Sequence, residues 1–372
     1  MKTWHSLAAL ALAACSAHAG EDEIVAPPPA WVEVNPDPVR IDGVLFTPTC
    51  SGAPETDPAY RFWYRQGSGD GLVVFFDGGG ACWDDVTCAV PRRARDRNDD
   101  GGLYKAELLP GDNPSAMQGI FDLANPRNPV RDWSFVFVPY CTGDVHVGAA
   151  AAHYSDPDTG ALYTIQHRGG DNFRAILHWM GAHVSQPRIL LVTGSSAGAY
   201  GAAAHYPAIR ETYPDGDAIM LADAGQGVSA PGSAALRNRA WNYQPSPAIF
   251  GGEGDDAIAR LAAHFPRDRF AQYTTSADVT QRAYYALTGG ERTCSAWTDA
   301  MAAALEQRQQ IPNFRSYLAA GETHIILRRR LLYTERSGGA VFADWFAALL
   351  GPALPENRAC TDCLAPPTQC AF

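Results

Sequence analysis

The sequence predicts an α/β fold with a mostly parallel sheet and helices on both faces. Short apolar runs rich in β-branched and aromatic residues are typical of buried strands, at residues 72–76, 135–138, 189–193 and 218–221. Helix-like stretches lie between and after them, at residues 171–181, 255–265, 297–310 and 341–350. Such alternation favours parallel strands buried on both sides. Ligands of these sheets gather at the carboxyl ends of the strands, so candidate functional residues are sought there.

The length and net charge of the chain limit the classes of protein to which it can belong. The chain has 372 residues, 46% of them hydrophobic, and 40 acidic against 29 basic residues give a net charge of −11. Nucleic-acid binding depends on clustered Lys and Arg, so a nucleic-acid partner is not expected. Without internal repeats or a long linker, residues 20–372 are expected to form a single catalytic domain.

The first 19 residues are typical of an export signal. Lys2 precedes an apolar run at residues 7–14, and Ala17-His18-Ala19 fits a signal-peptide cleavage site. Leu12-Ala-Ala-Cys15 also fits a lipoprotein signal, which would leave a lipid anchor on Cys15. No later stretch has the roughly 18 apolar residues of a transmembrane helix. We expect a secreted or periplasmic protein, or alternatively an outer-membrane-anchored lipoprotein.

The cysteines agree with export. Either cleavage leaves an even set of eight, namely Cys50, Cys82, Cys88, Cys141, Cys294, Cys360, Cys363 and Cys370. An even number suits disulfides in an oxidising compartment, and four are predicted. The short spacing suggests that Cys82 pairs with Cys88. For Cys360-Thr-Asp-Cys363 in the Pro-rich tail, structural bridging is favoured over a redox or zinc motif, because the chain has no second CxxC.

A candidate nucleophile follows the third predicted strand. The segment Gly194-Ser195-Ser196-Ala197-Gly198 lies between that strand and an Ala-rich helix start. This is the strand, G-x-S-x-G and helix context of a nucleophile elbow, whose central serine projects above the sheet. The helix N-terminus also favours developing negative charge. The alternative is a tight turn without chemistry. Ser195 suits the role less, because it precedes the apex.

A glycine loop after the first predicted strand is a candidate oxyanion hole. The run at residues 71–76 leads into Asp77 and three glycines, Gly78, Gly79 and Gly80. Acyl transfer needs backbone N–H groups close to the carbonyl oxygen, and glycines allow that approach. A second N–H would come from Ala197, after the nucleophile. A plain turn is the alternative. A phosphate-binding loop is disfavoured, since no Gly-Lys-Ser/Thr follows.

Three histidines follow Ser196 in the chain order expected for the general base. His205 lies too far along the elbow helix, and His264 falls within an amphipathic helical stretch. His324 lies in a loop after the strand-like residues 314–318 and is the preferred candidate.

Together these motifs resemble the pectin acetylesterase/Notum family of α/β-hydrolases, in a bacterial-type member. The resemblance spans roughly residues 50–350, and its ordered motifs begin at Asp77, Asn128, Val138, Gly194, Leu221 and Thr323. It implies an α/β-hydrolase fold, oxyanion-hole N–H groups from Gly79, Gly80 and Ala197, and a triad of Ser196, Asp278 and His324. The sequence departs from the family at Asp77, usually Glu, and at Ala81, a Trp in plant members.

Asp278 and Asp223 compete for the role of the triad acid. Asp223 ends the strand-like residues 218–221, but the resemblance assigns it to the fold around the site. Asp278 follows a predicted strand at residues 269–274 and leads towards His324. Asp268 and Asp299 are weaker alternatives.

The predicted function is an exported serine carboxylic-ester hydrolase that forms an acyl-enzyme and requires no cofactor. Its substrate would be an acetylated polysaccharide or another acylated extracellular molecule. The alternatives are a polyester or lipid-ester hydrolase and a catalytically silent binding protein with the same fold.

An acidic loop matches the calcium-loop pattern D-x-[DN]-x-[DN]-G-x₅-E. Its candidate ligands are Asp96, Asn98, Asp100 and Glu107. Pro91 and Pro110 leave little room for flanking helices, which favours a solvated acidic loop over a structural calcium site.

Overall fold

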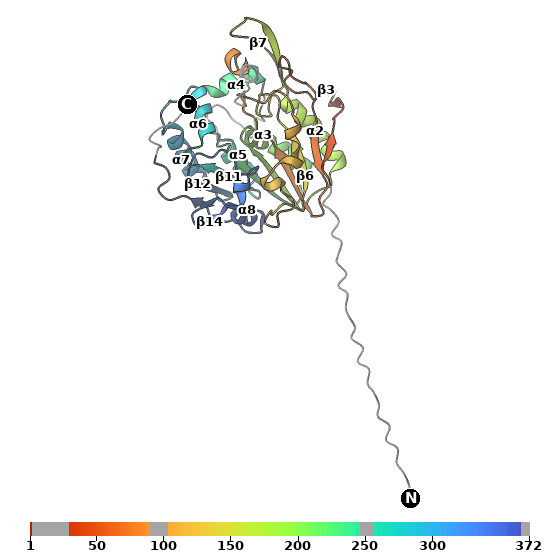
Figure 1. Cartoon of the computed structure of the whole chain (residues 1–372), viewed down its shortest axis with the longest axis vertical. Coiled ribbons are helices and arrows are strands. Elements are labelled where there is room, and N and C mark those ends of the chain that lie inside the picture. Colours follow the sequence, from red (N-terminus) through yellow and green to blue (C-terminus); the bar gives the residue numbers. More distant parts are fainter. Residues whose placement is uncertain (2–29, 90–102, 244, 246–255, 366–372) are drawn as a thin grey trace.

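A computed structural model describes residues 1, 30–89, 103–243, 245 and 256–365 (Figure 1). The signal-peptide positions, including Cys15, therefore lie outside the described residues. Within them, a nine-stranded sheet has the order β1-β4-β6-β5-β9-β10-β11-β12-β15. In that order its strands span Val32–Val34, Phe62–Arg65, Ser134–Val138, Gly71–Phe76, Ile189–Ser195, Asp217–Asp223, Arg269–Thr275, Phe314–Ala319 and Arg358–Ala359.

The sheet is mostly parallel, as the sequence predicts. The strands from β6 to β15 run parallel to their neighbours, whereas β1 and β4 add an antiparallel edge. All six predicted strands are present within one or two residues of their expected bounds. The register sets Phe76 beside Gly194 and Ser195 beside Asp223. The segments that follow β5, β9 and β10 therefore meet at one edge of the sheet.

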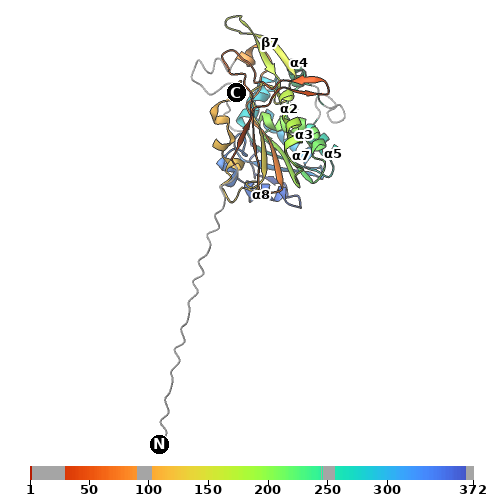
Figure 2. The same ribbon diagram turned by 90° about the vertical axis from the view of Figure 1, so that its right-hand side faces the viewer.

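Both faces of the sheet are covered. Successive side chains of a strand point to opposite faces. Phe75 of β5 packs against Phe121 of η3 (Gly119–Phe121), while Phe76 packs against Phe173 of α2 (Gly169–His183). On the Phe76 face, α2 contacts α3 (Ala197–Thr212), which contacts α5 (Ala257–His264), and Figure 2 shows these three helices close together. On the Phe75 face, η3 contacts η4 (Arg330–Tyr333), which contacts α8 (Phe342–Leu350).

One hairpin and one helix lie together at one end of the molecule. The hairpin of β7 (Ala150–Ser155) and β8 (Leu162–His167) contacts α4 (Ser233–Trp241) at one end of the molecule, opposite α8 (Figure 1). The sequence analysis did not predict this hairpin or α4. The remaining elements are β2 (Val39–Ile41), β3 (Val44–Phe46), η1 (Pro110–Asp112), η2 (Pro114–Ala116), α6 (Val279–Leu287), α7 (Ala296–Arg308), β13 (Arg336–Ser337) and β14 (Ala340–Val341).

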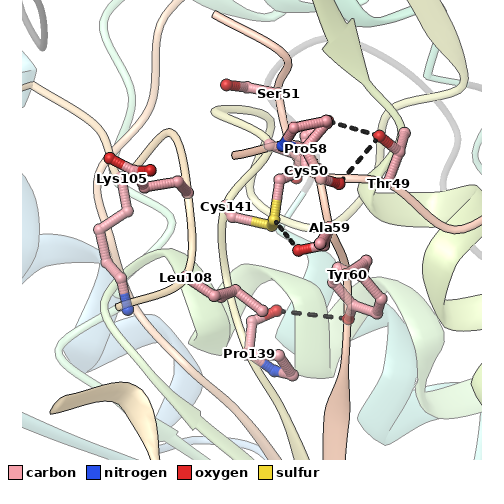
Figure 3. Close-up of a disulfide and its surroundings, with 12 residues drawn as sticks. Thr49, Cys50, Ser51, Pro58, Ala59, Tyr60, Lys105, Leu108, Pro139 and Cys141 are labelled. Carbon is pink, nitrogen blue, oxygen red and sulfur yellow. Dashed lines mark hydrogen bonds between the residues drawn. A yellow bond between two sulfur atoms is a disulfide. The ribbon is translucent and has the colours of Figure 1, made fainter. Parts of the chain in front are cut away.

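Disulfides tie loops to the sheet. The Cys82–Cys88 disulfide is present as predicted, and Cys360–Cys363 shows that the tail CxxC forms a structural bridge. Cys50–Cys141 joins the segment before β4 to the segment after β6 (Figure 3). Cys294 is disulfide-bonded as well, and Cys370 lies outside the described residues. Disulfides of this kind fit an oxidising compartment.

Within the described part of the chain, none of the helices has both the length and the apolar character needed to cross a membrane.

Candidate active site

Ser196 occupies a sharp turn between β9 and α3. Its backbone has φ 58° and ψ −123°, a conformation that costs free energy for a residue with a side chain. A Cβ at Gly198 would collide with the Phe76 carbonyl, and one at Gly194 would collide with Gly198. The Ser196 N–H donates to the Asp223 carbonyl at 2.8 Å. The small flanking residues thus allow β5, β9 and α3 to approach closely and hold Ser196 in its strained conformation.

The glycine loop after β5 lies against this turn. A Cβ at Gly78 would stand 3.0 Å from the Cβ of Ser196. The Gly79 carbonyl accepts the Lys105 N–H at 2.8 Å. Since the described peptide bonds are trans, the N–H of Gly80 points away from Lys105. Among the described residues, the N–H groups of Gly79, Gly80 and Ala197 have no hydrogen-bond acceptor. They are therefore free to donate to a ligand.

Two tyrosine hydroxyls fix the glycine loop, and the sequence analysis missed both. Tyr140 donates to the Gly80 carbonyl at 2.8 Å and accepts the Val145 N–H at 2.9 Å. Tyr284 of α6 donates to the Leu103 carbonyl and accepts the Ala81 N–H at 3.2 Å. Burial raises the pKa of Tyr284 to about 12, so its hydroxyl remains a donor near neutral pH. Tyr140 lies within the family-like motif that begins at Val138, but that motif does not reveal its role, and no motif marks Tyr284. The contacts of both hydroxyls depend on tertiary structure.

Asp278 and His324 are hydrogen-bonded to each other. The Nδ1 of His324 lies 2.8 Å from one carboxylate oxygen of Asp278 and 3.0 Å from the other. Asp278 is fully buried at the N-cap of α6, where it accepts the backbone N–H of Gln281 at 3.0 Å. The amide side chain of Gln281 donates to the same carboxylate at 3.0 Å. The opposite ring nitrogen of His324, Nε2, is buried and has no hydrogen-bond partner among the described residues.

Gln281 is a third residue of the site that was not predicted from the sequence. Besides holding Asp278, its side-chain oxygen accepts the N–H of Gln226 at 3.0 Å, which links α6 to the loop after β10. A helix-start pattern could have revealed it, since Asp278 and Gln281 have the N-cap and N3 spacing of a capping box.

The loop that carries His324 is held by several contacts. Thr275, the last residue of β11, donates from its hydroxyl to the Thr323 carbonyl at 2.9 Å. Ile325 has φ 58°, an uncommon value for a β-branched residue. The following N–H groups of Ile326 and Leu327 both donate to the Asp223 carboxylate at 2.9 Å. These bonds offset the cost of the strained turn beside His324.

Asp223 makes hydrogen bonds with Ser195 and with the backbone of the histidine loop, and it makes none with the His324 side chain. It is fully buried, and its carboxylate accepts the Ser195 hydroxyl at 2.5 Å in addition to the two N–H groups of the histidine loop. Burial raises the pKa of Asp223 to about 6, although these hydrogen bonds act in the opposite direction. Ser195, the flanking serine, is thus turned towards Asp223.

Asp77 connects the glycine loop to the histidine loop. Its buried carboxylate pairs with Lys105 at 3.0 Å and with Arg328, four residues after His324. Burial by itself raises the pKa of Asp77, but the charges of Lys105 and Arg328 more than offset this and hold that pKa below its ordinary value. The aspartate that departs from the family pattern is therefore an ionised anchor between two loops of the site.

The other candidate histidines and acids have different surroundings. His205 is largely buried, with its Nε2 2.7 Å from the His146 carbonyl, and burial lowers its pKa to about 4. His264 is exposed at the end of α5. Asp268 accepts the hydroxyl of Tyr206 and the guanidinium of Arg210, while Asp299 is exposed in the first turn of α7.

A cleft of about 850 Å³ opens at this edge of the sheet. Ser196 and His324 line it together with Gly80 and Ala197, whereas Gly79 does not. Much of the remaining lining is aromatic, including Trp83, Tyr200, Trp241, Tyr284 and Trp297. The arrangement offers a serine hydroxyl, an imidazole and backbone N–H groups around one mainly apolar space. It can accommodate an ester and the oxyanion formed from it.

The calcium prediction gains no support from the structure. Asp96, Asn98 and Asp100 lie outside the described residues, and the Glu107 carboxylate accepts the Asp57 N–H at 3.0 Å.

Cys82, Cys88 and His167 lie close enough to share a metal ion, but the disulfide uses both sulfurs. The two ring nitrogens of His167 are hydrogen-bonded to the Thr142 carbonyl and the Tyr154 hydroxyl.

The fold and the elbow define an α/β protein of the hydrolase type. A family model described as Pectinacetylesterase matches residues 54–242, about half of the chain, so the protein belongs to the pectinacetylesterase family. Family membership supports an esterase role and an ester substrate. The matched segment contains Gly79, Gly80, Ser196 and Ala197 and ends before Asp278 and His324. A search of curated proteins gave no match.

Proposed function

We propose that this protein is a serine carboxylic-ester hydrolase with Ser196 as nucleophile, His324 as general base and Asp278 as the acid that orients the imidazole. The observation that carries the proposal is the shared cleft. Ser196 at its strained turn and the hydrogen-bonded pair of His324 and Asp278 line or support one space, beside the free N–H groups of Gly80 and Ala197. The groups that acyl transfer requires therefore line or adjoin one cleft.

In the proposed reaction, the Ser196 oxygen attacks the ester carbonyl while the Nε2 of His324 takes the hydroxyl proton. That nitrogen has no hydrogen-bond partner among the described residues, and serine–histidine hydrogen bonds are often long in unliganded sites. The N–H groups of Gly80 and Ala197, with Gly79 in support, stabilise the oxyanion. His324 then gives the proton to the leaving alcohol. Water, deprotonated by the same imidazole, releases the acid from Ser196.

Asp278 would keep the imidazole in the tautomer with Nδ1 protonated and would stabilise the imidazolium. Its complete burial and its two hydrogen bonds from Gln281 fix the carboxylate opposite Nδ1. No cofactor takes part in the proposed mechanism.

The proposed substrates are acetylated or otherwise acylated extracellular molecules, acetylated polysaccharide among them. The family supports an acetyl ester, and the disulfides together with the leader-like first 19 residues support export to the periplasm or beyond.

The test is a panel of p-nitrophenyl esters of increasing acyl length, together with acetylated polysaccharide and an insoluble polyester. The wild-type protein should release p-nitrophenol, and Ser196→Ala should lose at least about three orders of magnitude in kcat while remaining folded. A fluorophosphonate probe should modify Ser196, as located by peptide mass spectrometry. Hydrolysis of no ester would favour a silent binding protein, and preference for the insoluble polymer would favour a depolymerase.

A further inference from the structure

One cation in the cleft has no anionic partner among the described residues. Arg237 of α4 is half-buried and lines the cleft that contains Ser196 and His324. Its one hydrogen bond to the described residues goes from the guanidinium to the Ser229 hydroxyl at 3.3 Å. None of the described carboxylates forms an ion pair with it. A guanidinium has five N–H donors, so most of its hydrogen-bonding capacity is unused.

The other charged groups of the lining neutralise each other. Arg308 pairs with Asp256, and it also donates to the Gln226 carbonyl at 2.7 Å and to the Gln272 side chain at 2.6 Å. Among the described lining residues, this leaves Arg237 as the unbalanced charge. The protein carries a net charge of −11, so an unpaired cation in the cleft contrasts with the charge of the whole chain.

Arg237 shares its cleft with Ser196 and His324. Ser229 and Tyr200 also line the cleft, and the positive charge of Arg237 acts on the Tyr200 hydroxyl, lowering its pKa against the larger effect of burial. Tyr200 follows Ser196 by four residues, which is about one turn of α3. A group bound by Arg237 would therefore lie in the same cleft as the proposed nucleophile.

Burial of a cation without a partner costs free energy, and the pKa of Arg237 is lowered because burial disfavours its charge. A bound anion would remove this cost. A carboxylate suits the site best, because the planar guanidinium binds it through two parallel hydrogen bonds. The aromatic lining can pack against the uncharged part of the same molecule.

We propose that Arg237 forms an anion subsite that selects ester substrates with a carboxylate near the scissile bond. The carboxylate could belong to the alcohol part of the ester or to its acyl part. This inference rests on the proposed esterase function, and it adds a specificity residue from α4, an element outside the proposed triad and oxyanion hole.

The test compares matched pairs of charged and neutral esters. For the alcohol side, 4-acetoxybenzoate is compared with its methyl ester. For the acyl side, mono-4-nitrophenyl glutarate is compared with 4-nitrophenyl pentanoate. Arg237→Gln should lower kcat/KM for the charged ester of at least one pair by about ten-fold or more, the usual value of a hydrogen bond to a charged group, and should change both neutral esters by less than about two-fold.

Arg239→Gln is the matched control, since Arg239 is exposed on the same helix and does not line the cleft. Arg239→Gln should leave kcat/KM for all four esters unchanged. The subsite is refuted if Arg237→Gln affects charged and neutral esters equally or affects none of them.

A binding measurement separates this inference from the proposed function. Calorimetry of 4-acetoxybenzoate with Ser196→Ala should give a Kd about ten-fold lower than with Ser196→Ala/Arg237→Gln. If the wild-type protein hydrolyses no ester, the esterase proposal fails while this comparison still decides whether Arg237 binds a carboxylate. Equal affinities would overturn the anion subsite even in an active esterase.

Discussion

Asp223 and Asp278 are both fully buried at the carboxyl edge of the sheet, but they make different contacts. Asp223 ends β10, and its hydrogen bonds go to Ser195 and to the backbone of the histidine loop. Asp278 lies three residues beyond β11, and its carboxylate contacts the imidazole of His324 and the amide of Gln281. The Asp223 carboxylate thus binds backbone N–H groups, whereas the Asp278 carboxylate binds the imidazole.

The difference shows that position at a strand end does not by itself identify a catalytic carboxylate. The N–H groups accepted by Asp223 follow a strained residue, Ile325, so this aspartate stabilises the loop that carries His324. Its backbone carbonyl also accepts the Ser196 N–H. Asp223 therefore supports both Ser196 and the histidine loop. The hydrogen-bond partners of a carboxylate distinguish a supporting aspartate from the proposed triad acid better than its place in the sheet does.

The largest effect is expected when the imidazole is removed. His324→Ala should lower kcat by about four orders of magnitude or more, because the proposed base is lost. Residues that act as one unit are not additive, so His324→Ala/Asp278→Asn should be no more than about ten-fold slower than His324→Ala. Steady-state kinetics on p-nitrophenyl acetate measures both. If the kcat losses of His324→Ala and Asp278→Asn multiplied in the double variant, Asp278 would act independently of His324. Asp278 would then not be the acid that orients the imidazole.

Stability should show the reverse ranking of the two aspartates. Asp223→Ala leaves three buried donors without an acceptor and should lower the free energy of unfolding by about 3 kcal/mol or more. Asp278→Ala removes a helix N-cap and should cost about 1 to 2 kcal/mol. Urea unfolding followed by circular dichroism gives both values. If Asp223→Ala does not fold, Asp223→Asn replaces it. A larger loss at Asp278 would contradict the supporting role of Asp223.

The effect of pH sharpens the comparison further. Burial raises the pKa of Asp223 from 3.8 to about 6, so the native state binds this proton more tightly than the unfolded chain does. Its contribution to stability is complete below about pH 4 and is lost as pH rises through about 6. Between pH 4.5 and 7, wild type should lose about 2 kcal/mol of unfolding free energy relative to Asp223→Asn. Urea unfolding at both pH values tests this, and a constant difference would argue against the raised pKa.

The smallest effect is expected at the flanking serine. Ser195→Ala removes one hydrogen bond to Asp223 and should cost about 1 kcal/mol of stability. Its kcat should remain within about ten-fold of wild type, since the hydroxyl is turned away from the cleft towards Asp223. Thermal unfolding and kinetics on p-nitrophenyl acetate check the two statements. A loss of kcat as large as that of Ser196→Ala would move the nucleophile to Ser195.

Much of the fold could be predicted from the sequence because its central strands are continuous apolar runs. The segments at residues 72–76 and 189–193 are buried on both faces, and their pattern shows this directly. The edge strands β1 and β4 and the hairpin of β7 and β8 were missed. They are short or partly exposed, so their patterns carry less information.

The residues of the candidate site were predictable only where a chemical role is tied to a local sequence motif. Ser196 and the glycine loop have recognisable sequence contexts, chain order and a late loop indicate His324, and the resemblance to a family favours Asp278. Tyr284, Arg328 and Arg237 could not be found in this way, because their places in the site depend on tertiary structure. The loop with Asp96, Asn98 and Asp100 lies outside the described residues, so its calcium pattern stays a prediction.

The central claim is that Asp278, and not Asp223, is the acid of the proposed triad. The most direct test compares kcat for Asp278→Asn and Asp223→Asn on one ester, with circular dichroism to show that both variants are folded. Asp278→Asn is expected to lose about four orders of magnitude in kcat, and Asp223→Asn is expected to lose much less. A folded, inactive Asp223→Asn beside an Asp278→Asn variant that keeps most of its turnover would contradict it.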